Sequence, residues 1–174
     1  MENKQYWFAA YTKARHEKSV AERLQQQDIE IFLPVIREKK RWTDRTKEII
    51  TPLIKSYLFV NIEPKNLLYV LQTYGVCSVV KIGGKYTKIP EYQISALKKA
   101  LEERVSLTPE KYFHKGELVQ VLTGPLKGKM GRIINIQGKT KLLLNIDAIN
   151  YAFSTPISPE NVKKVAKNSK GVDL

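Results

Sequence analysis

The densest apolar segment of the chain, residues 49–62, constrains the fold more than any other stretch because it is rich in strand-forming residues. At the two-residue period of a strand, Leu58 and Val60 share one face, and Tyr57 and Phe59 share the other. A strand with two apolar faces usually lies in the middle of a sheet that is covered on both sides. We therefore expect the side of Tyr57 and Phe59 to be covered, either by helices of the same domain or by another protein.

The charge of the chain indicates its class of partner. Its 174 residues suffice for one ordinary domain or two small ones, and 43% hydrophobic residues are enough for a packed core. There are 30 Lys and Arg residues against 17 Asp and Glu, a net charge of +13, and both halves of the chain are basic. This distribution favours a polyanion, most often a nucleic acid, over a generally soluble basic protein as the alternative.

Membrane, redox and catalytic signals are weak in this sequence. No window approaches the roughly 18 apolar residues that a membrane span needs, so we expect a cytoplasmic protein. Cys77 lies in an apolar run and is expected to be a packed core thiol, and His16 is expected to be solvated at a helix start. Two histidines, one cysteine and no paired acidic motif predict neither an enzyme nor a metal nor a cofactor.

Strands and helices alternate in the first part of the chain. A helix over residues 16–27 is expected to carry a polar, basic face of Arg15, Ser19 and Arg23. The other expected elements are strands at 6–12, 31–33 and 76–82, a short helix after Pro64 that Gly75 closes, and a third helix from Pro90 to about Val105.

Residues 30–50 predict a long basic hairpin. The chain becomes heavily charged between Arg37 and Arg41, residues 43–46 are typical of a turn, and a strand returns at 47–50. Two interpretations stay open, a functional projection or a solvated sheet edge.

The pattern changes after residue 105. Residues 106–112 have little apolar content and are interpreted as a linker. Short strands separated by glycines then predict a small barrel, with strands at 118–122, 130–137, 141–146, 151–155 and 162–165. Gly124, Pro125, Gly128 and Gly131 suit a tight turn and a close backbone approach, and their spacing fits no phosphate-binding loop.

The glycine-rich segment from Gly124 to Ile133 resembles the KOW motif. Residues 7–13 and 52–60 resemble, in the same order, the amino-terminal domain of the NusG family. The resemblance covers residues 6 to about 165 and implies an α+β chain: an antiparallel sheet flanked by helices (NGN-like) joined to a small SH3-like KOW β-barrel. The boundaries that we expect are 1–105 for the NGN-like domain, 106–112 for the linker, 113–166 for the barrel and 167–174 for a flexible tail.

The resemblance also implies partners and sites. Family members bind the clamp of RNA polymerase and suppress pausing or termination, and specialised members contact the non-template DNA strand. Carried over by position, the polymerase-binding surface would be Tyr11, Pro52, Ile54, Tyr57 and Phe59. The nucleic-acid-binding residues would be Lys13, Arg15, Arg23, Gln26 and Gln27. The KOW domain would recruit a ribosomal protein or a termination factor, and the protein is expected to be a monomer.

Several positions are closer to specialised RfaH-like or UpxY-like paralogues than to the general factor, including Leu68-Tyr69-Val70 in place of a His-Thr-Thr contact motif. Residues 142–145 also resemble a carboxy-terminal domain that switches between helical and barrel forms. Pro156, Pro159 and nearby β-branched residues favour the barrel here. The alternative function is a KOW-containing ribosomal or rRNA-binding protein, which leaves the amino-terminal resemblance unexplained.

Overall fold

The computed structural model of the protein describes residues 4–41, 45–110 and 116–165. It is a mixed α/β chain with antiparallel sheets, and it divides into two compact units, residues 1–87 and 88–174. We call residues 1–87 unit 1 and residues 88–174 unit 2. The predicted tail over 167–174 lies outside the described residues.

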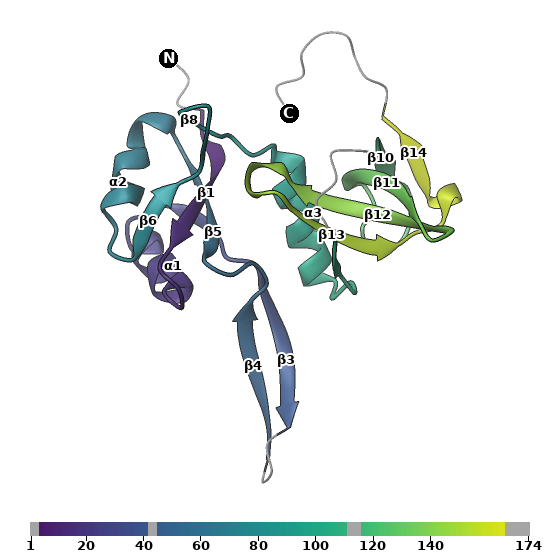
Figure 1. Ribbon diagram of the computed structural model, residues 1–174, viewed down its shortest axis with the longest axis horizontal. Helices are drawn as coiled ribbons and strands as arrows, with labels where there is room; N and C mark the ends of the chain where they lie inside the picture. Colours follow the sequence, from purple (N-terminus) through teal and green to yellow (C-terminus); the bar gives the residue numbers. More distant parts are fainter. Residues whose placement is uncertain (1–3, 42–44, 111–115, 166–174) are drawn as a thin grey trace. The chain divides into compact units, whose positions relative to one another are not determined.

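Unit 1 is built around a four-stranded antiparallel sheet of order β2-β5-β1-β6 (Figure 1). The apolar segment at residues 49–62 supplies β5, which is paired on both sides, by β1 and by β2. The elements of unit 1 in chain order are β1 (Tyr6–Thr12), α1 (Glu17–Gln25), β2 (Glu30–Phe32), β3 (Val35–Arg41), β4 (Thr46–Pro52), β5 (Tyr57–Ile62), η1 (Pro64–Asn66), α2 (Leu67–Gln72), β6 (Val76–Val79), β7 (Lys81–Ile82) and β8 (Lys85–Tyr86).

The two faces of this sheet are both apolar, as the alternation in β5 predicts. Leu58 and Val60 join a core with Val20 and Leu24 of α1 and Val70 of α2, all fully buried. The helices of unit 1 therefore cover the face of Leu58 and Val60. On the other face Phe59 is also fully buried and its ring stacks on Phe32, with 5.9 Å between ring centroids.

Helix α1 ends earlier than its polar carboxyl-terminal sequence suggests. The prediction ran to residue 27, whereas the helix stops at Gln25. Asp28 takes the left-handed conformation with φ 56°, and the N–H of Ile29 donates to the carbonyl of Leu24 at 3.1 Å. This is the hydrogen-bond pattern of a Schellman ending, with aspartate where glycine is usual. No glycine marks the position, so the end of the helix was not predictable from turn chemistry.

Cys77 is exposed, so its prediction as a packed core thiol is wrong. It lies on β6, which is an edge strand of the sheet. Val79 of this strand is buried, whereas Cys77 and Ser78 are exposed. An apolar run on an edge strand therefore does not guarantee burial of each of its members.

The predicted basic hairpin is confirmed. Strands β3 and β4 form a two-stranded antiparallel sheet of their own, in register from Val35 opposite Pro52 to Arg41 opposite Thr46. In Figure 1 the two strands extend away from the sheet that contains β5. Part of the predicted turn at 43–46 lies outside the described residues.

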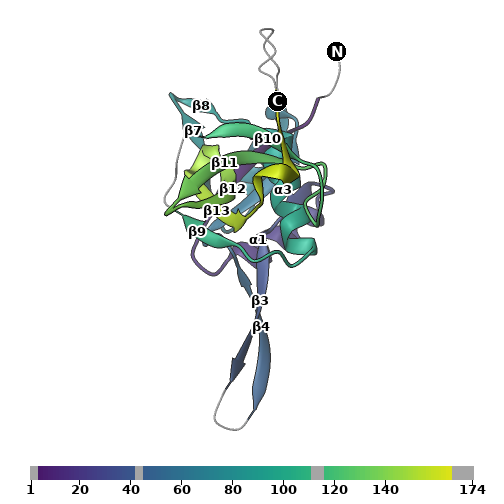
Figure 2. The ribbon, with the colours of Figure 1, turned by 90° about the vertical axis from the view of Figure 1, so that its right-hand side faces the viewer.

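Unit 2 combines one helix with a six-stranded antiparallel sheet of order β14-β10-β11-β12-β13-β9, strongly curved in Figure 2. The five strands predicted after residue 116 are confirmed, and the helical alternative for residues 142–145 is not observed. No pairing closes β14 onto β9 among the described residues. The elements of unit 2 are α3 (Glu91–Glu102), β9 (Thr108–Glu110), β10 (Glu117–Val121), β11 (Met130–Ile136), β12 (Lys139–Ile146), η2 (Asp147–Ile149), β13 (Tyr151–Pro156), η3 (Pro159–Asn161) and β14 (Val162–Lys164).

Helix α3 belongs to unit 2 through both apolar and polar contacts. It packs on β11 and β12, and its buried Ala96 and Ala100 share a core with Val119 and Leu142. The side-chain amide of Gln93 donates to the carboxylate of Asp147 at 2.7 Å and accepts from its backbone N–H at 3.1 Å. The expected boundary at residue 105 instead assigns this helix to the amino-terminal domain, and that division stays a prediction.

The described part of the predicted linker, residues 106–110, contains a short strand. Residues 108–110 form β9, which pairs with β13, and Leu107 packs against the unit 2 core. Glu110 of β9 accepts hydrogen bonds from the Lys141 ammonium and the Ser154 hydroxyl, each at 2.7 Å. This polar anchor explains how a segment with few apolar residues becomes ordered, a signal that hydrophobic periodicity does not carry.

The same anchor makes the stability of unit 2 depend on pH. The Lys141 hydrogen bond, followed by that of Ser154, holds the pKa of Glu110 below its ordinary value. A depressed folded-state pKa contributes stability that is present above the unfolded-state pKa, about 4.3, and is lost as the pH falls through the lower folded-state pKa. Glu110→Gln is therefore expected to lower the melting temperature at pH 7, with the difference from the native protein vanishing near pH 2.

Thermal unfolding followed by circular dichroism across this pH range checks the expectation. The matched control is Glu117→Gln, because Glu117 also pairs with a lysine, Lys164 at 2.8 Å, but both side chains are largely exposed. Exposed pairs contribute little to stability. A melting-temperature difference for Glu110→Gln that stays constant from pH 7 to pH 2 would contradict the role assigned to the ionised carboxylate.

Candidate functional site

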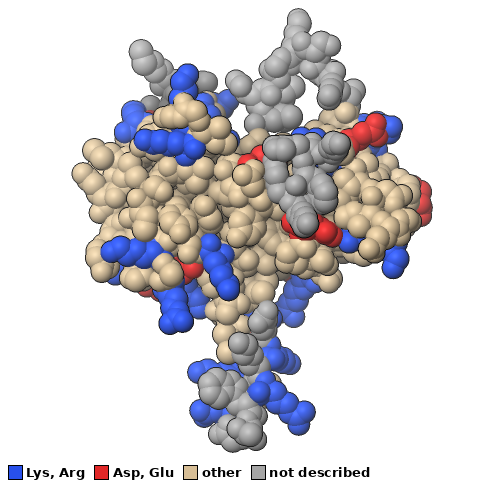
Figure 3. Space-filling model, viewed as in Figure 1, with Lys and Arg blue, Asp and Glu red and all other residues tan. Residues whose placement is uncertain are grey.

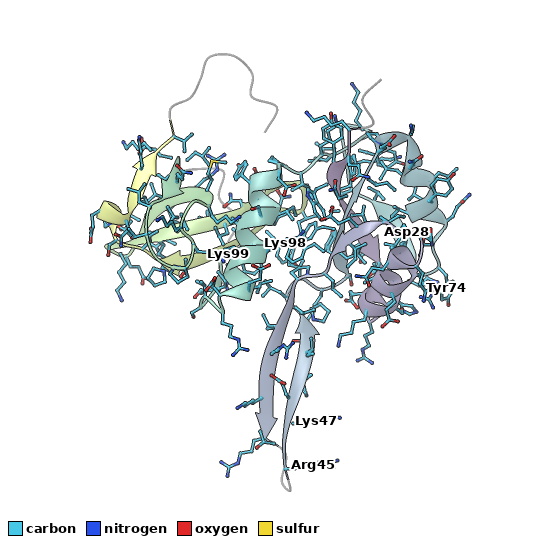
Figure 4. All side chains as sticks on the ribbon, turned by 180° about the vertical axis from the view of Figure 1, so that it is seen from behind. Asp28, Arg45, Lys47, Tyr74, Lys98 and Lys99 are labelled. Carbon is cyan, nitrogen blue, oxygen red and sulfur yellow. The ribbon has the colours of Figure 1, made fainter. Side chains whose placement is uncertain are left out.

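An exposed aromatic ring surrounded by cations stands out on unit 1. The Tyr74 side chain is 64% exposed and follows the end of α2, where Figure 4 shows it at the surface. The Lys13 Nζ lies 5.0 Å from the ring centroid and the Arg23 Cζ lies 5.4 Å from it. The His16 ring meets it edge-on at 6.1 Å. We call Lys13, His16, Arg23 and Tyr74 the Tyr74 cluster.

Local backbone geometry brings the members of this cluster together. The N–H of Lys13 donates to the carbonyl of Gly75 at 2.9 Å, and Arg23 Nη1 donates to the carbonyl of Tyr74 at 3.4 Å. Gly75 has φ +101°, and a Cβ there would lie 2.7 Å from Val20 Cγ2. The contact with α1 therefore requires glycine at this position, which fixes Tyr74 beside the basic face of the helix.

Three predicted nucleic-acid residues are placed around this cluster rather than in it. Arg15 is exposed in the turn before α1, where its φ of 64° is left-handed, and Gln26 is exposed at the carboxyl cap. The Gln27 side chain donates to the Thr73 hydroxyl at 3.3 Å, and that hydroxyl donates to the carbonyl of Tyr69 at 2.9 Å. Gln27 thus ties the end of α1 to the end of α2 next to Tyr74.

Sequence reasoning missed Tyr74 and assigned His16 to solvent. Periodicity identifies residues that are buried, and Tyr74 is neither buried nor part of α2. The available signal was a tyrosine directly before the glycine that closes the helix, opposite a helix with a basic face. That signal becomes meaningful only when the contacts of α1 and Gln27 with the segment after α2 are known.

The chemistry of the cluster suits a nucleic acid. Every base has a π-face that can stack on an aromatic ring irrespective of sequence, while lysine and arginine neutralise backbone phosphates. No group of three or more His, Cys, Asp or Glu side chains that could hold a metal ion occurs in residues 4–41, 45–110 and 116–165. Within the same ranges, no helix is long and apolar enough to cross a membrane.

The five predicted polymerase-binding residues differ in accessibility. Tyr11 is 41% exposed, and its ring lies 5.2 Å from that of the half-buried Tyr57 on the paired strand. Pro52, at the end of β4, is also half-buried. Ile54 and Phe59 are fully buried, so Tyr11 and Tyr57 present most of the accessible aromatic surface of the set.

The four predicted KOW-motif residues form a turn and a close contact. Gly124 and Gly128 both have φ +81° in the connection from β10 to β11, where the N–H of Lys127 donates to the carbonyl of Gly124 at 3.1 Å. Pro125 is exposed in this turn. A Cβ on Gly131 would lie 2.9 Å from the carbonyl oxygen of Leu143 on β12. Glycine is thus needed at residue 131 because two strands approach closely there.

The fold and the cluster define a class of protein, a small α+β chain with a basic aromatic surface beside a helix-flanked antiparallel sheet. The family model described as "NusG: Transcription termination factor nusG" matches residues 5–98, more than half of the chain. The chain therefore belongs to the NusG family of transcription factors. The matched region ends within α3, beyond the boundary between the two units.

Among solved structures, the chain is similar to NusG of Thermotoga maritima, in a structure titled for its domain interaction. The identity is 17%, the match covers 94% of this chain and 98% of that one, and the TM-score is 0.45. It is also similar to the MjSpt4:Spt5 complex in conformation A, at 19% identity, 93% and 99% coverage and a TM-score of 0.30. Comparison with curated protein sequences gave no significant match.

Proposed function

We propose that this protein is a non-catalytic elongation or antitermination factor that binds RNA polymerase through unit 1 and contacts single-stranded nucleic acid through the Tyr74 cluster. The observation that carries the proposal is the exposed Tyr74 ring between two cations in a chain of the NusG family. The factor would act in the cytoplasm as a monomer, on the clamp of polymerase and the non-template DNA strand.

Of the five residues predicted for the polymerase contact, Tyr11, Pro52 and Tyr57 are accessible and would make it, whereas Ile54 and Phe59 are fully buried and would support the surface from below. Tyr11 and Tyr57 would act as its anchors because aromatic side chains dominate binding energy at interface centres. The curved sheet of unit 2, with its glycine-rich turn, would be a KOW domain that recruits a ribosomal protein or a termination factor. The sequence pattern at 68–70 supports an operon-specific role related to RfaH-like or UpxY-like paralogues.

Transcription in vitro with purified polymerase tests the proposal directly. Adding the protein is expected to shorten pauses or to increase read-through of a terminator. If polymerase shows neither effect while ribosomal subunits co-purify with the protein from lysate, the alternative of a ribosomal or rRNA-binding protein replaces it.

Replacing Tyr74 by alanine is expected to weaken single-stranded DNA binding about 5- to 150-fold, because stacking of one base contributes about 1–3 kcal/mol. The dependence of affinity on salt should not change, since no charge is removed. Combined alanine replacement of Lys13, Arg15 and Arg23 should instead flatten the log–log salt slope by about 2, at about 0.7 per phosphate on single strands.

Fluorescence anisotropy with a labelled oligonucleotide at several salt concentrations measures both effects. Tyr69→Ala is the matched control, because Tyr69 is 58% exposed and lies on the adjoining helix α2. Equal losses for Tyr74→Ala and Tyr69→Ala would show that Tyr74 has no special role.

A further inference from the structure

One carboxylate of unit 1 is buried and bound to a backbone amide. Glu17, in the first turn of α1, is only 6% exposed. Its Oε1 accepts a hydrogen bond from the backbone N–H of Ser56 at 2.8 Å. Lysine and arginine are abundant on the surface, as Figure 3 shows for the projecting β3–β4 hairpin, yet this carboxylate is directed at the backbone. A charged side chain is rarely buried without a specific partner, so the contact with Ser56 requires an explanation.

Ser56 needs this partner because its backbone conformation is unfavourable for serine. Its φ is 61°, in the left-handed region that residues other than glycine rarely adopt. The ladder between β1 and β5 ends at the pair of Tyr11 and Tyr57, one residue further along the chain. The carbonyl of Ser56 accepts from the N–H of Thr12 at 2.8 Å. Glu17 and Thr12 together therefore hold both backbone polar groups of Ser56.

Strand β1 is irregular at the same end of the sheet. Its pairing with β6 shifts register between Tyr11 and Thr12, as at a β-bulge. A bulge interrupts the regular ladder and redirects the strand locally. The two hydrogen bonds at Ser56 therefore complete the sheet at the end that carries Tyr11 and Tyr57.

The first turn of α1 also holds the strand that leads into this connection. The Lys18 ammonium donates to the carbonyl of Ile50 on β4 at 2.8 Å. Two successive residues of one helix thus bind the backbone at both ends of residues 50–56. Pro52 lies within that segment, and Tyr57 follows it directly. Two of the accessible residues assigned to the polymerase surface are therefore on, or next to, backbone that α1 fixes.

We propose that Glu17 is a positioning residue of the polymerase-docking surface and acts through the backbone of Ser56. The inference rests on the proposed function and adds to it a residue that does not touch the partner. The bound carboxylate keeps the connection in the conformation that presents Tyr57 beside Tyr11, with 5.2 Å between ring centroids. Without it, φ of Ser56 returns to the negative values that serine prefers. A surface that is competent in only a fraction of the molecules binds more weakly by that fraction.

This role requires an acceptor at the right distance from α1. Glutamine keeps an amide oxygen at the distance of the native carboxylate. Aspartate keeps the charge, which favours the first turn of a helix, but its side chain is one methylene shorter. Leucine fills the buried space and has no acceptor. Substitutions of Glu17 by these three residues therefore separate the hydrogen bond from charge and from packing.

The test is titration of purified RNA polymerase with the full chain and its variants. Glu17→Leu and Glu17→Asp are each expected to weaken binding about 10-fold, the effect of losing one hydrogen bond to a charged group. Glu17→Gln should stay within about 3-fold of the native chain, because it keeps the acceptor. The matched control is Glu22→Leu, which removes the same charge from an exposed position on the same helix and should bind as the native chain does.

Amide hydrogen exchange shows whether the effect is local. The Ser56 N–H should exchange faster in Glu17→Leu and Glu17→Asp than in the native chain and in Glu17→Gln, whereas the amides of β5 should keep their protection. Loss of protection throughout β5 in the Leu and Asp variants, together with loss of polymerase binding, would make Glu17 a determinant of folding and overturn the positioning role.

Two binding results would also overturn the inference. One is native-strength binding by Glu17→Leu or Glu17→Asp despite faster exchange at Ser56. The other is an equal loss for Glu17→Gln and Glu17→Leu, which would assign the effect to charge. Tyr57→Asp, titrated in parallel, separates these failures from failure of the proposed function. If Tyr57→Asp binds at native strength, the docking surface lies elsewhere and both proposals fall, whereas loss for Tyr57→Asp alone removes only the role of Glu17.

Discussion

Replacing Tyr57 by aspartate is expected to abolish co-purification of this protein with RNA polymerase. Tyr57 and Tyr11 form an aromatic pair at 5.2 Å across two paired strands, and Tyr11 is 41% exposed. Aromatic anchors at the centre of an interface contribute about 2 kcal/mol or more each, or roughly 30-fold in affinity. A carboxylate at the same place adds the cost of burying an unpaired charge under the partner.

The measurement is affinity capture with purified polymerase, after circular dichroism has shown that the variant is folded. Tyr151→Asp is the matched control, because Tyr151 is 37% exposed and lies on β13 in unit 2. Ile54→Asp would not separate docking from folding, since the Ile54 side chain is fully buried and a charge there also costs stability. Capture of polymerase by Tyr57→Asp at native strength would place the docking surface elsewhere.

The second large effect concerns the borders of the folded units. A fragment of residues 88–165 is expected to fold, whereas residues 113–165 are expected to show no cooperative transition. The shorter fragment lacks Ala96 and Ala100 of α3, which complete the unit 2 core, and the hydrogen bonds of Gln93 to Asp147. It also lacks β9, which leaves β13 without its partner on that side.

Thermal unfolding of both fragments, followed by circular dichroism, decides between the two divisions of the chain. Residues 1–87 serve as the parallel fragment and are expected to retain polymerase binding. If residues 113–165 unfold as cooperatively and at the same temperature as residues 88–165, α3 and β9 are dispensable for unit 2. The boundaries expected from the sequence, at 105 and 113, would then describe the folding units better.

The sequence predicted the elements of this protein well where hydrophobic periodicity is strong. The strand at residues 6–12, the two-sided strand that begins at Tyr57 and the five short strands after residue 116 are all present. The basic hairpin was also predictable, because a charged run from Arg37 to Arg41 and a returning strand at 47–50 flank residues that are typical of a turn. These features depend on local pattern, which the sequence carries directly.

The errors arise where tertiary contacts override local pattern. Cys77 is exposed because β6 happens to be an edge strand, and an edge is a property of strand order rather than of the strand itself. Glu110 orders β9 through two polar partners distant in sequence. The Tyr74 cluster needs the carbonyl of Gly75 to reach Lys13. In each of these cases the neighbouring strand or the contacting residue is distant in sequence. The local pattern around the position therefore does not predict the outcome.

The hairpin has one further consequence, for how this protein can change over time. Within the described residues, its strands pair with each other and with no strand of the four-stranded sheet. Adding or removing two residues in each strand would change its reach by about 6.6 Å while keeping every side chain on its present face, whereas a one-residue slip would reverse the faces. Length and charge can therefore change here without disturbing the core of the four-stranded sheet.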